Sequence, residues 1–206
     1  MDEIRRGLWH WSAPHPAWND RQSWQQRVSS YAYDDGERLL LFDPLDVPDE
    51  LRELATRRAA HIVLTCPWHR RDAVPLASEL GAQIHVPPPD GPDPDPVPGL
   101  VFEAGDVLDI GVEARAGLEP NDLVLWIPAA RAIVTGDTLI DFGAGLVFPT
   151  EWATTGVPSE VGVSAAELLA GLQPLLDLPV DVVLPTHGVP SDRTALERAL
   201  AIDLTT

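Results

Sequence analysis

The chain has 206 residues, 45% of them hydrophobic, so it is long and apolar enough to bury a core as one domain, residues 1–206. Its 32 acidic residues outnumber the 14 basic ones and give a formal charge of -18, which disfavours nucleic acids and anionic membranes as partners. All basic residues are arginines, the single cysteine (Cys66) allows no internal disulfide, and no stretch approaches the ~20 apolar residues of a membrane span, so we expect a cytoplasmic protein.

Tryptophans are concentrated at the start of the chain. Trp9 and Trp11 alternate like one face of a strand, and the residues from His15 to Trp18 then form a turn. Two interpretations remain open: the aromatic residues form a hydrophobic lid over the core, or His15 and Trp18 lie at the rim of a pocket.

The pattern between residues 28 and 86 predicts strands and helices in alternation. The expected strands are 28–33, 38–42, 61–65 and 83–86, and the expected helices are 49–60 and 73–80. Residues 34–36, Asp-Asp-Gly, predict a hairpin turn. We expect Asp72 to cap the second helix and Gly81 to end it.

Residues 87–99 contain seven prolines and the acidic residues Asp90, Asp93 and Asp95. This composition predicts a stiff, acidic, solvated loop. Neither half of the chain looks like a complete core, so we interpret the loop as a spacer within one domain.

The second half repeats the pattern of the first. The expected strands are 107–113, 123–127, 132–135 and 181–184, and the expected helices are 164–176 and 191–202. Ser164 to Glu167 forms a capping box at the start of the first of these helices. Residues 141–163 are expected to be irregular.

Polar groups follow four of the apolar strands. Asp43 ends one strand, the turn from Thr65 to Asp72 follows the next, and Asp137 and His187 follow two strands of the second half. Carboxylates and imidazoles at one edge of the sheets would suit metal ligation or acid–base chemistry.

Three segments resemble strand ends of the metallo-β-lactamase superfamily: Leu-Leu-Leu-Phe-Asp at 39–43, Ile-Val-Thr-Gly-Asp-Thr-Leu at 133–139 and Pro-Thr-His-Gly at 185–188. The resemblance covers nearly the whole chain. It implies an α/β (α+β) fold, a four-layer αββα sandwich, and descent from hydrolases. It also implies that Asp137 corresponds to an aspartate that bridges two metals and His187 to a metal ligand.

The chain departs from the superfamily in the ligand motif Thr-His-x-His-x-Asp-His. That motif falls on residues 65–71, where cysteine, tryptophan and two arginines stand at the ligand positions, and the mid-chain Gly-His turn is Gly117-Leu118. The resemblance is therefore to a degenerate branch in which a standard dinuclear metal site cannot form. Neither antibiotic hydrolysis nor nuclease activity is expected from it.

One hypothesis is a hydrolase with a single divalent metal, either zinc, iron or manganese. Asp137 and His187 would be ligands, and either His69, displaced by one position, or Cys66 would complete the set. Three protein ligands would leave a position for a water that is nucleophilic near neutral pH.

Two other hypotheses need no metal. The first is an acid–base enzyme, whose catalytic groups would be His69, Asp72, Asp137 and His187. A small-molecule substrate would contact Arg70, Arg71, Trp68, His15 and Trp18. One of the arginines could hold a substrate carboxylate. The second is a binding or structural protein that has kept the fold without the chemistry, in which Asp137 serves stability.

Overall fold

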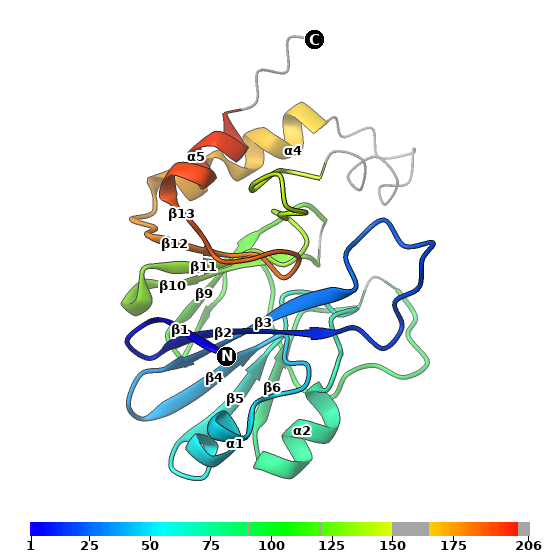
Figure 1. The fold of residues 1–206 in the computed structure, drawn as a ribbon, viewed down its shortest axis with the longest axis vertical. Coiled ribbons are helices and arrows are strands. Elements are labelled where there is room, and N and C mark those ends of the chain that lie inside the picture. Colours follow the sequence, from blue (N-terminus) through cyan, green and yellow to red (C-terminus); the bar gives the residue numbers. More distant parts are fainter. Residues whose placement is uncertain (90, 120, 150–164, 202–206) are drawn as a thin grey trace.

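The computed structural model describes residues 1–89, 91–119, 121–149 and 165–201. Two β-sheets lie face to face, and helices cover the outer face of each sheet (Figure 1). The layers therefore run helix, sheet, sheet, helix, which confirms the predicted αββα sandwich. Among the described helices none is both long and apolar enough to cross a membrane.

Within the described residues, the first sheet has the strand order β1-β2-β3-β4-β5-β6-β7 and the second has the order β13-β12-β11-β10-β9-β8. The strands of the first sheet are β1 (Asp2–Arg5), β2 (Leu8–Pro14), β3 (Arg27–Asp34), β4 (Arg38–Phe42), β5 (Ala59–Val63), β6 (Gln83–Val86) and β7 (Leu100–Val101). Those of the second are β8 (Val107–Leu108), β9 (Val112–Ala116), β10 (Leu123–Ile127), β11 (Ala132–Val134), β12 (Val182–Leu184) and β13 (Ser191–Asp192). The pairs β4–β5 and β11–β12 are parallel.

The helices cover the two outer faces. They are α1 (Asp49–Ala55), α2 (Ala73–Leu80), α4 (Ala165–Leu172) and α5 (Arg193–Leu200), with 3-10 turns η1 (Pro128–Ala130) and η2 (Gln173–Asp177). Leu51 of α1 and Leu76 of α2 pack with the outward side chains of the first sheet. Leu172 of α4 and Leu196 of α5 pack in the same way on the second sheet.

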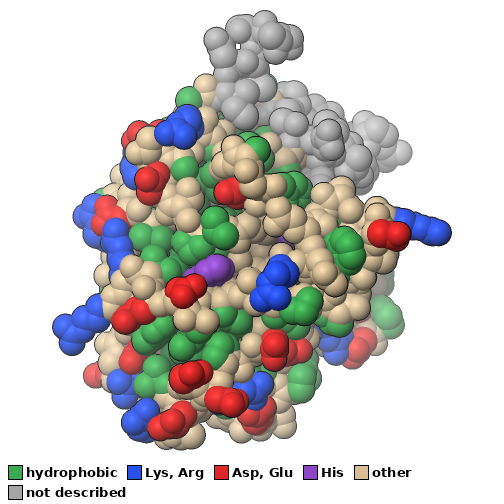
Figure 2. All heavy atoms as spheres, in the orientation of Figure 1, with side chains coloured by type: hydrophobic (Ala, Val, Ile, Leu, Met, Phe, Trp, Pro, Cys, Tyr) green, Lys and Arg blue, Asp and Glu red, His purple; other side chains and the backbone are tan. Residues whose placement is uncertain are grey.

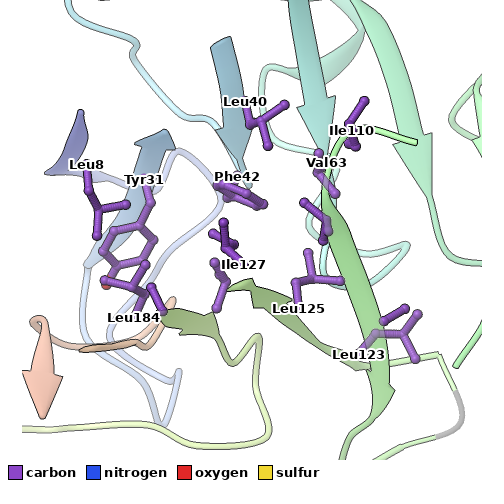
Figure 3. Close-up of a cluster of buried hydrophobic side chains, with 14 of the residues drawn as sticks. Leu8, Tyr31, Leu40, Phe42, Val63, Ile110, Leu123, Leu125, Ile127 and Leu184 are labelled. Carbon is purple, nitrogen blue, oxygen red and sulfur yellow. The ribbon is translucent and has the colours of Figure 1, made fainter. Parts of the chain in front are cut away.

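The main core lies between the sheets. Leu40 and Phe42 of β4 point into it, whereas Leu39 and Leu41 pack toward α1 and α2, so this continuous apolar run is buried on both faces. Figure 3 shows the inner side chains of the two sheets packed against one another. Each large aliphatic or aromatic side chain buried in this way contributes about 1.5–3 kcal/mol.

Several predicted boundaries were wrong. The helix expected at 49–60 ends at Ala55, because the backbone of Ala59 already pairs with Glu37 at the start of β5. The strand expected at 107–113 is divided by a turn at 109–111 into β8 and β9. The helix expected to run to residue 176 changes to the 3-10 turn η2 at Gln173, next to a proline. The capping box at Ser164 and the loop residue Asp90 lie outside the described residues.

Two predicted helix ends have different outcomes. Gly81 ends α2 in the left-handed conformation, as expected. Asp72 occupies the cap position of α2, but its carboxylate accepts a hydrogen bond from the backbone N–H of Asp46, 2.7 Å away, and makes no cap bond to its own helix. In α5, Asp192 caps the helix by accepting from the N–H of Ala195, so this helix begins at Arg193 rather than at residue 191.

Candidate active site

The polar residues after β4, β5, β11 and β12 lie together at one edge of the sandwich. Parallel strands in each sheet bring their carboxyl ends to the same side, as in other α/β folds where ligands bind at strand ends. Backbone hydrogen bonds join the sheets here: Leu123 N donates to Thr65 O, and Ser29 N donates to Thr186 O. These bonds fix the two groups of strand ends relative to each other.

Asp137 is at the centre of this cluster. Its Oδ1 lies 3.3 Å from Nε2 of His69 and 3.4 Å from Nε2 of His187. Its Oδ2 accepts a hydrogen bond of 2.9 Å from the indole N–H of Trp68. Oδ1 is buried, and within the described chain no group is oriented to donate a hydrogen bond to it. The carboxylate is thus anchored by one oxygen and presents the other to two imidazoles.

His69 is held from its other side by a buried carboxylate. Nδ1 of His69 lies 3.2 Å from Oδ2 of Asp43 and 3.1 Å from Oγ1 of Thr65. Asp43 also accepts hydrogen bonds from the backbone N–H of Thr65 at 2.9 Å and from its hydroxyl at 2.6 Å. The ring orientation of His69 is therefore set by the end of β4.

A second buried carboxylate, Asp122, supports Asp137 from behind. Its Oδ1 accepts from the N–H of Asp137 at 3.1 Å, and its Oδ2 accepts from the hydroxyl of Thr138 at 2.6 Å. Burial and the nearby charge of Asp137 raise the pKa of Asp122 well above its usual value. Asp122 was not predicted from the sequence, since an aspartate before a strand looks like an ordinary turn residue.

The absence of a side chain at Gly136 lets the carboxylate of Asp122 lie close to the backbone before Asp137. Its φ is +53°, and a Cβ there would lie 2.2 Å from Oδ1 of Asp122 and 3.1 Å from Cβ of Thr65. We expect Gly136→Ala to lower the free energy of unfolding by about 2–4 kcal/mol through backbone strain and displacement of Asp122. Urea denaturation measures this loss. Gly91→Ala, with open space at the Cβ position, is the matched control, and equal stability of the two variants would contradict the prediction.

Burial and charge set the protonation of the two imidazoles. Burial lowers the pKa of His187 to about 4, so its ring is neutral at pH 7. Burial also opposes charging of His69, but Cys66, Asp137 and Asp43 around it hold its pKa well above the usual value. The Cys66 thiol stays neutral because burial raises its pKa. The charges that raise the pKa of His69 are therefore those of Asp137 and Asp43. Burial opposes the charge of Asp137, but His69 and then His187 lower the pKa of its carboxyl.

A pocket of about 330 Å³ opens beside this cluster. It is lined by His15, Ser23, Trp24, Val28, Trp68, His69, Arg71, Asp137 and His187. Trp24 packs edge-on against both His15 and His187, with ring centroids 5.2 and 5.3 Å apart. Figure 2 shows acidic and basic side chains interspersed over one face of the molecule. The pocket volume of about 330 Å³ lies at the small end of the range of ligand pockets.

The structure brings together six of the nine residues expected at a site: His15, Trp68, His69, Arg71, Asp137 and His187. It places the other three elsewhere. Trp18 donates to the backbone of Trp24, Arg70 forms an ion pair with Asp95 of the proline-rich loop, and Asp72 bonds to the backbone of Asp46.

Among the lining residues, Ser23, Trp24 and Val28 were not expected. The concentration of tryptophans before residue 24 was the only signal for Trp24. A group of possible metal ligands forms at the pocket as well: Cys66, His69 and Asp137 have ligand atoms within 4.8 Å of one another.

No protein-family model matches the chain, and no curated protein matches it in sequence. Solved structures do match it over nearly its whole length. DIM-1 metallo-β-lactamase has a TM-score of 0.66 at 12% identity, covering 97% of this chain and 94% of its own. A metallo-β-lactamase family protein from Thermus thermophilus has a TM-score of 0.65 at 16% identity, covering 96% and 78%.

TTHA1623, solved in a di-iron-bound form, matches with a TM-score of 0.59 at 24% identity, covering 84% of this chain and 93% of its own. At these identities the similarity shows the fold of the backbone and does not show what the site does. Together with the layers and strand order described above, it shows that this chain has the metallo-β-lactamase fold.

Proposed function

We propose that the chain is a hydrolase whose pocket holds a single divalent metal between His69, Asp137 and His187. The observation that carries this proposal is the buried Oδ1 of Asp137, which lies 3.3 and 3.4 Å from two imidazole Nε2 atoms without accepting a hydrogen bond from the described residues. Two ligand atoms bound tetrahedrally to one metal at about 2.0–2.1 Å are about 3.4 Å apart. The two separations from Oδ1 thus match edges of a coordination sphere. The described group whose ligand atoms all lie within 4.8 Å of one another is Cys66, His69 and Asp137, so metal binding would have to draw the ring of His187 toward that of His69.

The outer contacts of these residues also suit a metal. A metal-binding histidine commonly donates its other ring N–H to a carboxylate. Asp43 is placed to accept that N–H from Nδ1 of His69, which leaves Nε2 for the metal. Trp68 occupies Oδ2 of Asp137, which leaves Oδ1. His187 is neutral at pH 7, so one of its ring nitrogens carries a lone pair, and in the tautomer protonated at Nδ1 that nitrogen is Nε2.

The arginines of the turn favour one metal over two. The family motif places Arg70 and Arg71 at ligand positions, and a guanidinium offers no lone pair to a metal. Arg70 points away to Asp95. Arg71 donates from Nη1 to the backbone oxygens of Ser29 and Asp43, which keeps its positive charge beside the pocket. A second cation would be repelled there.

The chemistry follows from the ligand set. A divalent metal of this kind makes water nucleophilic near neutral pH and polarises a carbonyl or phosphoryl oxygen. The chain itself orients two of the three ligands: Asp43 orients His69, and Trp68 and the backbone bond to Asp122 orient Asp137. The pocket beside the ligands admits a small substrate, so an ester, a thioester or a phosphodiester is the class to examine.

The test is a turnover screen of the protein loaded in turn with zinc, iron(II) or manganese(II). We expect hydrolysis of one substrate class with one metal per chain, loss of activity on chelation and recovery on adding the metal back. Cys66→Ser should keep both metal and activity. No bound metal in a well-folded protein would contradict the proposal and would leave His69 as an imidazolium between two carboxylates, in a pocket that binds without hydrolysing.

Trp68→Phe isolates the contribution of the indole N–H to metal binding. The substitution keeps the aromatic ring and removes the donor to Oδ2 of Asp137, so the carboxylate can rotate away from the imidazoles. We expect metal affinity to fall by about 10–100-fold, the usual effect of losing an outer hydrogen bond at a metal site. Competition with a chromophoric chelator measures this, and Trp18→Phe, outside the pocket, is the control. Unchanged affinity in Trp68→Phe would show that the indole does not orient the ligand.

A further inference from the structure

Arg71 lines the pocket with a positive charge and is not a ligand of the proposed metal site. Its Nη1 is fully engaged, donating to the backbone oxygens of Ser29 at 2.7 Å and Asp43 at 2.6 Å and to the hydroxyl of Ser30 at 3.3 Å. Its Nε is buried and finds no acceptor among the described residues. The same side chain lines the 330 Å³ pocket together with Asp137 and His187. One edge of a fixed guanidinium therefore remains for a ligand.

The charges around the pocket select the ligand. An arginine edge with two N–H groups matches the two oxygens of a carboxylate, which accept parallel hydrogen bonds from it. Asp137 lines the same pocket and Arg71 contacts the backbone of Asp43, so a ligand of high negative charge is disfavoured next to these two carboxylates. A single carboxylate is balanced by the one arginine, whereas a phosphate dianion is not.

The walls of the pocket select the rest of the molecule. Trp24, Trp68 and Val28 line it and offer apolar and aromatic surface. Aromatic side chains of this kind pack against flat or apolar groups of a ligand. The pocket volume admits only a small molecule, so its carboxylate and its reacting bond would lie within one short compound.

We propose that the pocket takes a small monocarboxylate with an apolar body, held by Arg71 through Nε and the adjacent edge of the guanidinium. This deepens the proposed function, on which it rests: the substrate is an ester or thioester that also carries a carboxylate. Arg71 positions that substrate, while His69, Asp137 and His187 serve the reacting bond.

Calorimetric titration with benzoate, benzamide and phenyl phosphate tests the inference. We expect benzoate to bind the wild-type protein about tenfold more tightly than the neutral, isosteric benzamide and more tightly than the dianionic phenyl phosphate. Arg71→Lys keeps a positive charge that can still reach the carbonyls of Ser29 and Asp43, but it removes Nε–H. We expect the Arg71→Lys variant to remain folded and to bind benzoate about as weakly as benzamide, so the roughly tenfold preference for benzoate disappears.

Arg70→Lys is the matched control, because Arg70 lies in the same turn and pairs with Asp95 outside the pocket. It should bind benzoate like the wild type. The inference would be overturned if Arg71→Lys bound benzoate as tightly as the wild type does. It would also be overturned if the wild type bound phenyl phosphate more tightly than benzoate, or did not bind benzoate.

The titration is repeated on protein freed of metal by a chelator, which separates this inference from the proposed function. Benzoate that still binds through Arg71 supports the carboxylate site, even if the turnover screen finds no hydrolysis. Benzoate that binds only with metal present is a ligand of the metal and overturns the role of Arg71.

Discussion

Replacement of His187 by alanine is expected to remove the bound metal and to abolish hydrolysis. Nε2 of His187 lies 3.4 Å from Oδ1 of Asp137, and burial keeps the ring neutral, with a pKa of about 4. The alanine variant would leave only His69 and Asp137 from the proposed ligand set. We expect metal affinity to fall by more than the ~100-fold that follows loss of an outer partner. Elemental analysis of the dialysed protein gives the metal content, and turnover is measured on the same samples.

His61→Gln is the control for this experiment. His61 lies on β5, forms a 3.2 Å contact with His85 and does not line the pocket, so its replacement should leave metal content and turnover unchanged. Circular dichroism shows whether each variant is folded. Full metal occupancy in folded His187→Ala would contradict the proposed ligands and would favour the group of Cys66, His69 and Asp137.

Replacement of Asp43 by alanine is expected to give the largest loss of stability. Asp43 is fully buried and accepts from the N–H and the hydroxyl of Thr65, and it faces Nδ1 of His69. Removing it leaves buried donors and a buried imidazole without their acceptor. We expect the free energy of unfolding to fall by about 3–5 kcal/mol, the range found when one partner of a buried ionic pair is removed.

Chemical denaturation of three variants checks the cause of that loss. Asp43→Asn keeps a carbonyl oxygen that can accept from Thr65 N, so it should lose less stability than Asp43→Ala. Asp20→Ala removes an exposed carboxylate and should change stability by about 0.5 kcal/mol or less. If Asp43→Ala proved as stable as Asp20→Ala, the carboxylate would not be what holds the turn after β5.

The fold could be predicted from the sequence because its signals are local. The continuous apolar run of β4 reflects burial on both faces of a sheet, whereas the serines of β3 are buried at positions where the predicted alternation would have placed them toward solvent. The ends of the helices were predicted less accurately than the strands. The end of α1 depends on the pairing of Ala59 with Glu37, a contact that the local pattern around residue 55 does not contain.

The site could be predicted only in part. Asp137, His187 and the turn at His69 follow apolar strands, so their convergence could be expected. Arg70 and Arg71 are adjacent and chemically identical, yet one pairs with Asp95 and the other lines the pocket. The direction of each side chain depends on the backbone of the turn, where Arg71 has a φ of +37°. That geometry leaves no mark in the sequence.

The most direct test of the single-metal site is anomalous diffraction at the zinc edge from crystals of the zinc-loaded protein. The proposal predicts one peak at about 2.0–2.2 Å from Oδ1 of Asp137 and from Nε2 of His69 and His187. Two peaks in the pocket, a peak held by Sγ of Cys66 in place of His187, or no peak beside Asp137 would contradict it.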